Sequence, residues 1–162
     1  MGDQVIKYIE DFTARINISS DYLLKISDET AANKKSENKW SQKEILGHLI
    51  DSANVNYSRF INSVSKDDLV FETYPQNEWV ELQSYNNRDW KSLIELWKAL
   101  NLHIAELVKN LPEEKRKMLT INHNFNDICW SEISTDEESS FDYLIKDYIG
   151  HLEHHLKQIY DY

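Results

Sequence analysis

Residues 141–160 read FDYLIKDYIGHLEHHLKQIY and carry a helical pattern along their whole length. Alternating steps of three and four residues connect one set of positions, and this spacing places side chains on a single face of a helix. The set comprises Phe141, Leu144, Tyr148, His151, His155 and Gln158. The pattern predicts one long amphipathic helix that packs this face, its seam, against other helices.

The seam changes its chemical character partway along the helix. Its first half is apolar, whereas its second half carries His151, His155 and Gln158. A buried imidazole needs a polar partner, and two imidazoles on adjacent turns of one face can share one ligand. A divalent metal ion held between helices would satisfy both of them. The pattern therefore indicates a helix that binds metal in the interior of a helical protein.

The composition is typical of a single domain, residues 1–162, with a sizeable core. The chain has only three glycines and two prolines, which favours long helices, and its formal charge of −10 argues against nucleic acid or an anionic membrane as partner. A single cysteine, Cys129, excludes an internal disulfide framework. The N-terminal residues MGDQVIKYIEDF lack the apolar core of a signal peptide, and no apolar run reaches membrane-spanning length. We therefore expect a soluble cytoplasmic protein.

Three further amphipathic helices are expected before the last one. Their expected ranges are 3–28 with a kink or break at 17–21, about 42–63, and about 86–110. The second begins at a capping box, because Ser41 can cap the helix end and Glu44 follows three residues later. The third carries a seven-residue seam that includes Trp90 and Trp97.

The stretches between these helices are expected to be connections. The connection 64–84 is rich in aromatic residues, so we expect it to fold over one end of the helices. The connection 113–139 is expected to contain short extended pieces at 118–121 and 128–133. Four long amphipathic helices in one small domain predict an all-α fold, a four-helix bundle.

Three segments together resemble the DinB-like family, also called the DinB/YfiT-like metalloenzymes. They are WSQKEILGHLIDS at 40–52, WVELQSYNNRDWKSLIELWKALNLH at 79–103 and LIKDYIGHLEHHLKQI at 144–159. Each motif is weak alone, but their order and spacing are specific, and the resemblance covers roughly 40–159. It implies a four-helix bundle with an up-down-down-up course and a three-histidine metal site, with one histidine from the second helix and two from the last.

Carried over to this chain, the family pattern implies His48, His151 and His155 as the metal ligands. The run HLEHH leaves a choice between His154 and His155 as the partner of His151, and only His155 continues the seam through Tyr148. The resemblance also implies nickel, zinc or a similar divalent ion, and a homodimer. The chain departs from the family pattern at one point. Relatives often carry an acidic residue soon after the aspartate that follows the first histidine, whereas here residues 51–54 read DSAN.

Two interpretations of the histidines remain open at this point. Core histidines could hydrogen-bond to Asp51 and Asp147, each one helical turn from a histidine; around a metal, the same acids would fix the imidazole tautomers. Gln158 could orient a ligand or bridge two helices. Three other candidates are expected outside the site, with His103 at the rim, His123 in solvent and Cys129 as a packing residue. Trp79, Gln83 and Tyr85 are expected either to pack under a loop or to cover the site.

The leading hypothesis is a metalloenzyme that activates a thiol against a small electrophile, as some members of the resembled family do. Three imidazoles leave a coordination position open, which is typical of catalytic sites. Hydrolysis by metal-bound water is the alternative reaction, and a non-catalytic stress protein that binds metal or a small ligand is the alternative function. A small-molecule substrate, such as a low-molecular-weight thiol, is the expected partner. The sequence assigns no general acid or base.

Overall fold

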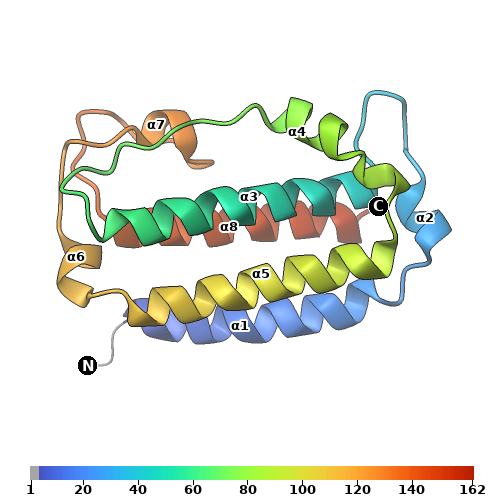
Figure 1. The fold of residues 1–162 in the computed structure, drawn as a ribbon, viewed down its shortest axis with the longest axis horizontal. Coiled ribbons are helices and arrows are strands. Elements are labelled where there is room, and N and C mark those ends of the chain that lie inside the picture. Colours follow the sequence, from blue (N-terminus) through green and yellow to red (C-terminus); the bar gives the residue numbers. More distant parts are fainter. Residues whose placement is uncertain (1–3) are drawn as a thin grey trace.

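The computed structural model describes residues 4–162 and consists almost entirely of helices (Figure 1). The four long helices are α1 (Gln4–Leu23), α3 (Gln42–Ser63), α5 (Trp90–Asn110) and α8 (Phe141–Tyr160). The short ones are α2 (Asp28–Ala32), α4 (Gln76–Gln83), the 3₁₀ helix η1 (Tyr85–Asn87), α6 (Glu113–Lys117) and α7 (Phe125–Ile128). In the described part of the chain, extended pairing is limited to two isolated bridges, Leu69 with His123 and Thr120 with Ser139.

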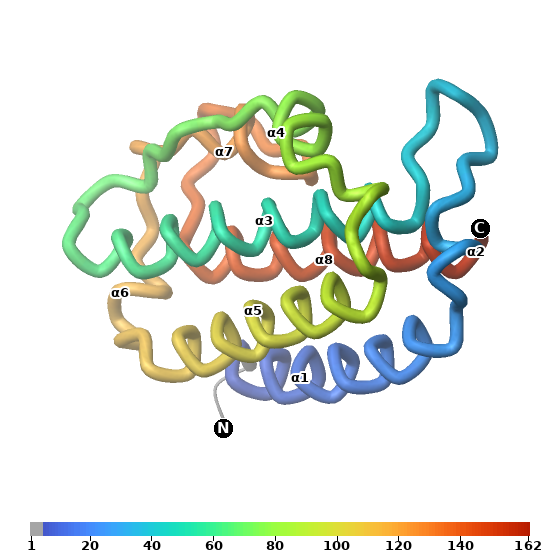
Figure 2. Tube along the Cα trace, turned by 45° about the vertical axis from the view of Figure 1, so that its right-hand side comes forward, coloured from blue at the N-terminus to red at the C-terminus, as the bar shows by residue number. Residues whose placement is uncertain are grey.

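The long helices form a four-helix bundle in which α1 and α8 run one way and α3 and α5 run the other (Figure 1). The course is therefore up-down-down-up, and the all-α four-helix prediction is confirmed. Helix α3 packs against both α5 and α8, while α1 packs mainly against α5. Since α3 and α5 are parallel, the chain from 64 to 89 must return along the whole bundle before α5 begins (Figure 2). No helix within residues 4–162 combines the length and the apolar character needed to cross a membrane.

The seams expected for α5 and α8 form the centre of the core. Trp90 and Trp97 of α5 are buried, as are Phe141, Leu144 and Tyr148 in the first half of α8. The polar second half of the α8 seam faces α3. The interior of the bundle is therefore apolar along most of its length and becomes polar where the histidines lie.

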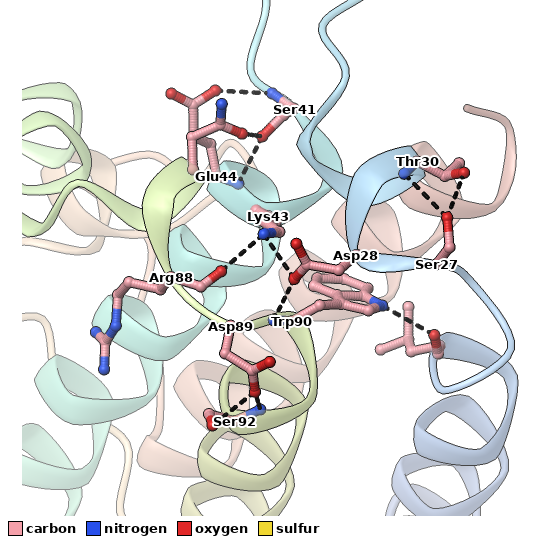
Figure 3. Close-up of polar contacts among 12 residues, drawn as sticks. Ser27, Asp28, Thr30, Ser41, Lys43, Glu44, Arg88, Asp89, Trp90 and Ser92 are labelled. Carbon is pink, nitrogen blue, oxygen red and sulfur yellow. Dashed lines mark hydrogen bonds and ion pairs between the residues drawn. The ribbon is translucent and has the colours of Figure 1, made fainter.

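A complete capping box begins α3. The Ser41 hydroxyl accepts a hydrogen bond from the Glu44 backbone N–H at 3.2 Å, and the Glu44 carboxylate accepts one from the Ser41 N–H at 2.8 Å (Figure 3). This confirms the helix start that the sequence predicts. The cap sets the first turns of α3 and with them the position of His48.

A buried lysine ties this end of α3 to the neighbouring elements. Lys43 donates to the Arg88 carbonyl at 2.7 Å and pairs with the Asp28 carboxylate at 2.8 Å (Figure 3). Asp28 also accepts from the Trp90 backbone N–H at 2.9 Å. Helices α2, α3 and α5 therefore meet at one polar junction, which restrains the rotation of α3.

The first helix differs from the prediction of 3–28 with an interruption at 17–21. Residue 3 lies outside the described residues, α1 ends at Leu23, and the helix passes through 17–21 without a break. The Asn17 amide donates to the Thr13 carbonyl of the same helix, and the Ser19 hydroxyl accepts from Tyr160 of α8 at 2.7 Å. Both hydrogen bonds are compatible with an unbroken helix, because a carbonyl oxygen has two lone pairs and can accept from the Asn17 side chain as well as from the helix backbone.

The connections also differ in part from expectation. The stretch 64–84 contains α4, which was expected to be loop, and α5 begins at Trp90 because Asp89 caps it by accepting from the Ser92 N–H at 2.8 Å. The extended piece expected at 118–121 is limited to the bridge at Thr120, and 128–133 forms no bridge.

Candidate metal centre

The packing of α3 against α8 brings the three predicted histidines together. His48 lies in the second turn of α3, and His151 and His155 lie on successive turns of α8. One ring nitrogen from each can be chosen so that all three atoms lie within 4.8 Å of one another. The Nε2 atoms of His48 and His151 are 3.2 Å apart. Two nitrogen ligands of a tetrahedral zinc ion lie about 3.4 Å apart, so this spacing suits a shared ion.

The ring of His155 is oriented by Gln158. The distance between His155 Nδ1 and Gln158 Oε1 is 2.8 Å, and because an amide oxygen only accepts, Nδ1 carries the proton. Nε2 of His155 is then unprotonated and available to a metal ion. The Gln158 amide nitrogen lies 3.1 Å from His154 Nε2 on the same helix. Of the two roles left open for Gln158, the structure shows orientation of His155 rather than a bridge between helices.

One interpretation of the histidines required hydrogen bonds in which Asp51 and Asp147 accept from them. Among the described residues these bonds are absent. Asp51 accepts from the Tyr85 hydroxyl at 2.7 Å and from the Gln83 amide at 3.3 Å. Asp147 accepts from the backbone N–H groups of Trp130 and Ser131. His48 Nδ1 is buried without a partner. The interpretation as core histidines held by these two acids is therefore not confirmed.

Burial keeps the imidazoles neutral at physiological pH. It lowers the pKa of His48 to about 4, with a smaller contribution from His155. It lowers the pKa of His151 to about 3, and the three neighbouring imidazoles add to the effect. The pKa of His155 is also lowered by burial, although the hydrogen bond to Gln158 opposes the shift. Neutral imidazoles present lone pairs, so the cluster favours a metal ion over protons.

A cavity of about 450 Å³ opens onto the α8 histidines. Its walls come from α3, from α8, from residues 73–76 and from residues 127–130. They include His151, His154, His155, Tyr148, Trp40, Trp130, Cys129, Asp147, Asp127, Ser52, Asn56, Arg59, Tyr74 and Gln76. A small molecule in this cavity would touch the imidazoles of His151 and His155 directly, and the volume falls within the range of small-molecule sites.

Tyr85 supports α3 from outside the cavity rather than covering it. Its ring packs on Gly47, where an added Cβ would lie 2.1 Å from a ring carbon. Its hydroxyl reaches Asp51 one turn further along, and Gln83 bonds to the same carboxylate. Tyr85 and Gln83 therefore buttress the turn that carries His48. Trp79 does not line the histidine cavity but a neighbouring one of about 620 Å³, which shares Arg59, Thr73 and Tyr74 with it.

Of the two histidines expected outside the site, the prediction for His103 is confirmed and that for His123 is wrong. His103 is exposed and stacks on Tyr57, as expected for a rim residue. His123 was expected in solvent, which is wrong, because it is 8 % exposed and donates from Nε2 to the Glu137 carbonyl at 2.8 Å. The fold buries it because the bridge to Leu69 pulls its loop against the bundle.

Cys129 and Arg59 are among the cavity-wall residues that the sequence did not identify as site residues. Cys129 was expected only in packing, yet it lines the cavity beside Asp147. Arg59 is buried and lines the same wall. A signal for Arg59 exists, because residues 48, 52, 56 and 59 are separated by steps of four, four and three and therefore share one face of α3.

The fold and the site define a helical bundle with a candidate three-histidine metal centre beside a small-molecule cavity. The sequence model of the DinB superfamily matches residues 11–159, and the chain belongs to this superfamily. The resemblance to the DinB/YfiT-like family is therefore confirmed.

Curated relatives carry names that refer to metal-dependent hydrolysis. BH0277 of Halalkalibacterium halodurans, named as a candidate metal-dependent hydrolase, is 32% identical over 75 residues, which span 46% of this chain and 43% of that protein. YfiT of Bacillus subtilis, with the same kind of name, is 22% identical over 157 residues, 97% of this chain and 81% of that protein. The chain thus matches less than half of the length of BH0277.

The solved structure of Bacillus subtilis YfiT has the same fold. It aligns with a TM-score of 0.77 at 18% identity and covers 99% of this chain and 86% of that one. Its description refers to an unusual four-helix bundle topology and a candidate metal-dependent hydrolase. At this identity the likeness supports the fold alone.

Proposed function

We propose that the protein is a metalloenzyme in which His48, His151 and His155 hold one divalent transition metal ion, nickel or zinc. The observation that carries the proposal is the convergence of three neutral imidazoles, of which His151 and His155 line a cavity. Because the protein would supply only three ligands, one coordination position would remain for a substrate, as in catalytic rather than structural zinc sites. The names of the relatives support metal dependence.

The reaction that we propose is transfer of a thiol to a small electrophile. A divalent ion at this site would lower the pKa of a bound thiol or water and supply a nucleophile at neutral pH. The three histidines would hold the ion without adding negative charge, because neutral imidazoles leave its positive charge available to a thiol. Trp40 packs beside His48 at 5.1 Å between ring centroids and shields that side from water.

Hydrolysis is the second candidate reaction, and the names of YfiT and BH0277 favour it. Both reactions would use the same ligands and the same cavity. They differ in one requirement, because a thiol transferase needs an added thiol and a hydrolase does not. The non-catalytic alternative, a stress protein that only stores metal or a small ligand, predicts no turnover with either.

Metal content of protein purified without a metal-affinity tag tests the proposed site. We expect about one equivalent of a transition metal per chain in the wild type, and loss of it in His48→Ala and His155→Ala. His154→Ala is the matched control, because His154 is adjacent on α8 but lies outside the three-nitrogen cluster. Retention of metal in His155→Ala together with its loss in His154→Ala would contradict the assignment. Absence of metal from wild type incubated with zinc or nickel would exclude the metalloenzyme.

Turnover assays on the metal-loaded protein then separate the two reactions. A panel of small electrophiles and esters is assayed with and without added thiol. Turnover that requires the thiol and disappears in His48→Ala supports thiol transfer, whereas thiol-independent turnover assigns hydrolysis. A homodimer and a cytoplasmic location remain predictions from the sequence.

A further inference from the structure

Arg59 is a buried cation in the wall of the histidine cavity. Its side chain is 6 % exposed, and the residue lines the cavity together with His151 and His155. It shares one face of α3 with His48, and the two Cα atoms lie about 16 Å apart at 1.5 Å per residue. Helical side chains lean toward the N-terminus of their helix, so the Arg59 side chain points back along α3 toward His48.

The other buried cations of the described chain have carboxylate partners, but Arg59 has none. Lys43 pairs with Asp28 at 2.8 Å and Arg116 pairs with Asp142 at 2.6 Å. Among the described residues Arg59 forms no ion pair with a carboxylate within 4.0 Å, although the Asp147 carboxylate of the same cavity wall acts on it over a longer distance. A buried cation without a carboxylate in direct contact is costly, so its position in a cavity wall favours an anionic ligand.

The guanidinium is also only partly hydrogen-bonded. Nη2 donates to the Glu72 carbonyl at 2.7 Å, and Nη1 makes a long contact of 3.5 Å with Asn56 Oδ1. Nε is buried without a partner. A guanidinium has five N–H donors, so Arg59 keeps donors for a further acceptor. The carboxylate of Asp147, which lines the same cavity, is occupied by two backbone N–H groups.

We propose that Arg59 binds a carboxylate of the small molecule whose reactive end lies at the three histidines. A guanidinium recognises a carboxylate through paired N–H donors. Asn56 and Tyr74 line the cavity beside Arg59 and offer further polar contacts. Arg59 is the only lysine or arginine of the cavity wall among the described residues, and Asp127 and Asp147 line it too. Because the two acidic side chains would repel a doubly charged phosphate more strongly than a singly charged carboxylate, the carboxylate is the favoured anion.

This inference rests on the proposed function, because the histidines fix where the reactive end lies. It adds the substrate class: a small carboxylic acid that spans from Arg59 to the histidine cluster.

Matched pairs of thiols test the proposal. The probes are ω-mercaptocarboxylates of three, six and eight carbons and the corresponding amides, which differ only in the anionic group. Affinity for cobalt-loaded protein is read from the thiolate-to-cobalt charge-transfer absorption. Calorimetric titration of metal-free protein with the same probes gives a second reading that does not need the metal. The variants are Arg59→Met, Arg59→Lys and, as control, Lys66→Met, which removes an exposed positive charge outside this cavity.

We expect wild type to bind the carboxylate at least tenfold more tightly than the amide for at least one chain length. Arg59→Met should bring the two affinities together by weakening carboxylate binding while amide binding stays within twofold, which also shows that the variant is folded. Arg59→Lys should retain part of the preference, and Lys66→Met all of it.

The outcomes separate this proposal from the proposed function. Equal affinities for carboxylate and amide in wild type at every length would overturn the role of Arg59, as would a preference that persists in Arg59→Met. A carboxylate preference in metal-free protein without any charge-transfer absorption after cobalt addition would support Arg59 and count against the metal centre instead.

Discussion

Two imidazoles of the cluster, those of His155 and His48, are held by different physical means. His155 is fixed by a hydrogen bond from its own Nδ1 to Gln158. His48 has no hydrogen bond at Nδ1 and is positioned by burial and by contact with Trp40. The position of His48 therefore depends on the packing of α3, whereas that of His155 depends on one side chain of its own helix.

The thiol of Cys129 gives a pH-dependent prediction at the residue scale. Burial raises the pKa of Cys129 far above its ordinary value, and the nearby Asp147 carboxylate raises the pKa further. A raised pKa leaves less thiolate at a given pH, and only the thiolate reacts with iodoacetamide. At pH 8 we expect folded protein to be alkylated at least tenfold more slowly than protein unfolded in urea. The measurement is the alkylation rate by mass spectrometry.

The control for this prediction is Asp147→Asn, which removes the negative charge beside the thiol. We expect the folded variant to react faster than folded wild type at the same pH, because the thiolate is then less disfavoured. Equal alkylation rates for folded and unfolded wild type would show that the thiol is not buried and that its pKa is not raised.

At the element scale, one glycine decides how closely α3 and the η1 segment approach. Gly47 faces the ring of Tyr85, which occupies the volume that a side chain at 47 would need. Gly150 of α8 is different, since an added Cβ would lie 3.6 Å from the Trp130 ring, an ordinary contact. The two glycines therefore separate the effect of helix propensity from the effect of packing.

Substitution of each glycine by alanine should change stability in opposite directions. Alanine favours a helix interior over glycine by about 0.5–1 kcal/mol, so Gly150→Ala should raise the free energy of unfolding by about that amount. Gly47→Ala should lower it by about 2 kcal/mol, because Tyr85 must move and overpacking of this kind costs about 1–3 kcal/mol. Urea denaturation measures both. A stabilised Gly47→Ala variant would mean that Tyr85 does not pack against α3 as described.

At the scale of the whole molecule, the candidate metal centre joins two helices that are distant in sequence. His48 comes from α3 and the other two histidines from α8, so an ion bound by all three would clamp these helices together. Because the unfolded chain does not hold the three imidazoles in one place, metal binding should stabilise the folded state by mass action.

Addition of zinc to metal-free protein should therefore raise the melting temperature. At a free metal concentration one hundred times the dissociation constant, the expected stabilisation is about 2.7 kcal/mol, or about 5–10 °C for a chain of this length. A chelator should reverse the shift. His48→Ala should show no shift, whereas His103→Ala, which alters an exposed histidine outside the cluster, should behave as wild type. An unchanged melting temperature in wild type would argue against the site.

Local patterns were sufficient for much of the fold, whereas the family resemblance supplied the three candidate ligands. The α8 seam, the Ser41–Glu44 capping box and the α5 seam each depend on residues a few positions apart, and each appears in the structure as predicted. The family resemblance added the up-down-down-up course. The choice of His155 over His154 followed from helical periodicity, which is a property of a single helix, and the structure groups His155 with His48 and His151.

The tertiary structure alone decided the cavity and its walls. Three features depend on where the long connections fold back against the helices. They are the formation of α4, the burial of His123, and the positions of Cys129 and Arg59 in the cavity wall. Contacts between residues far apart in sequence produce no periodic sequence pattern. The packing of Tyr85 on Gly47 and the lack of an ion pair at Arg59 therefore cannot be predicted from the spacing of residues. The sequence by itself determined the helices and the histidines that face inward, and the packing of α3, α8 and the connections determined what can reach them.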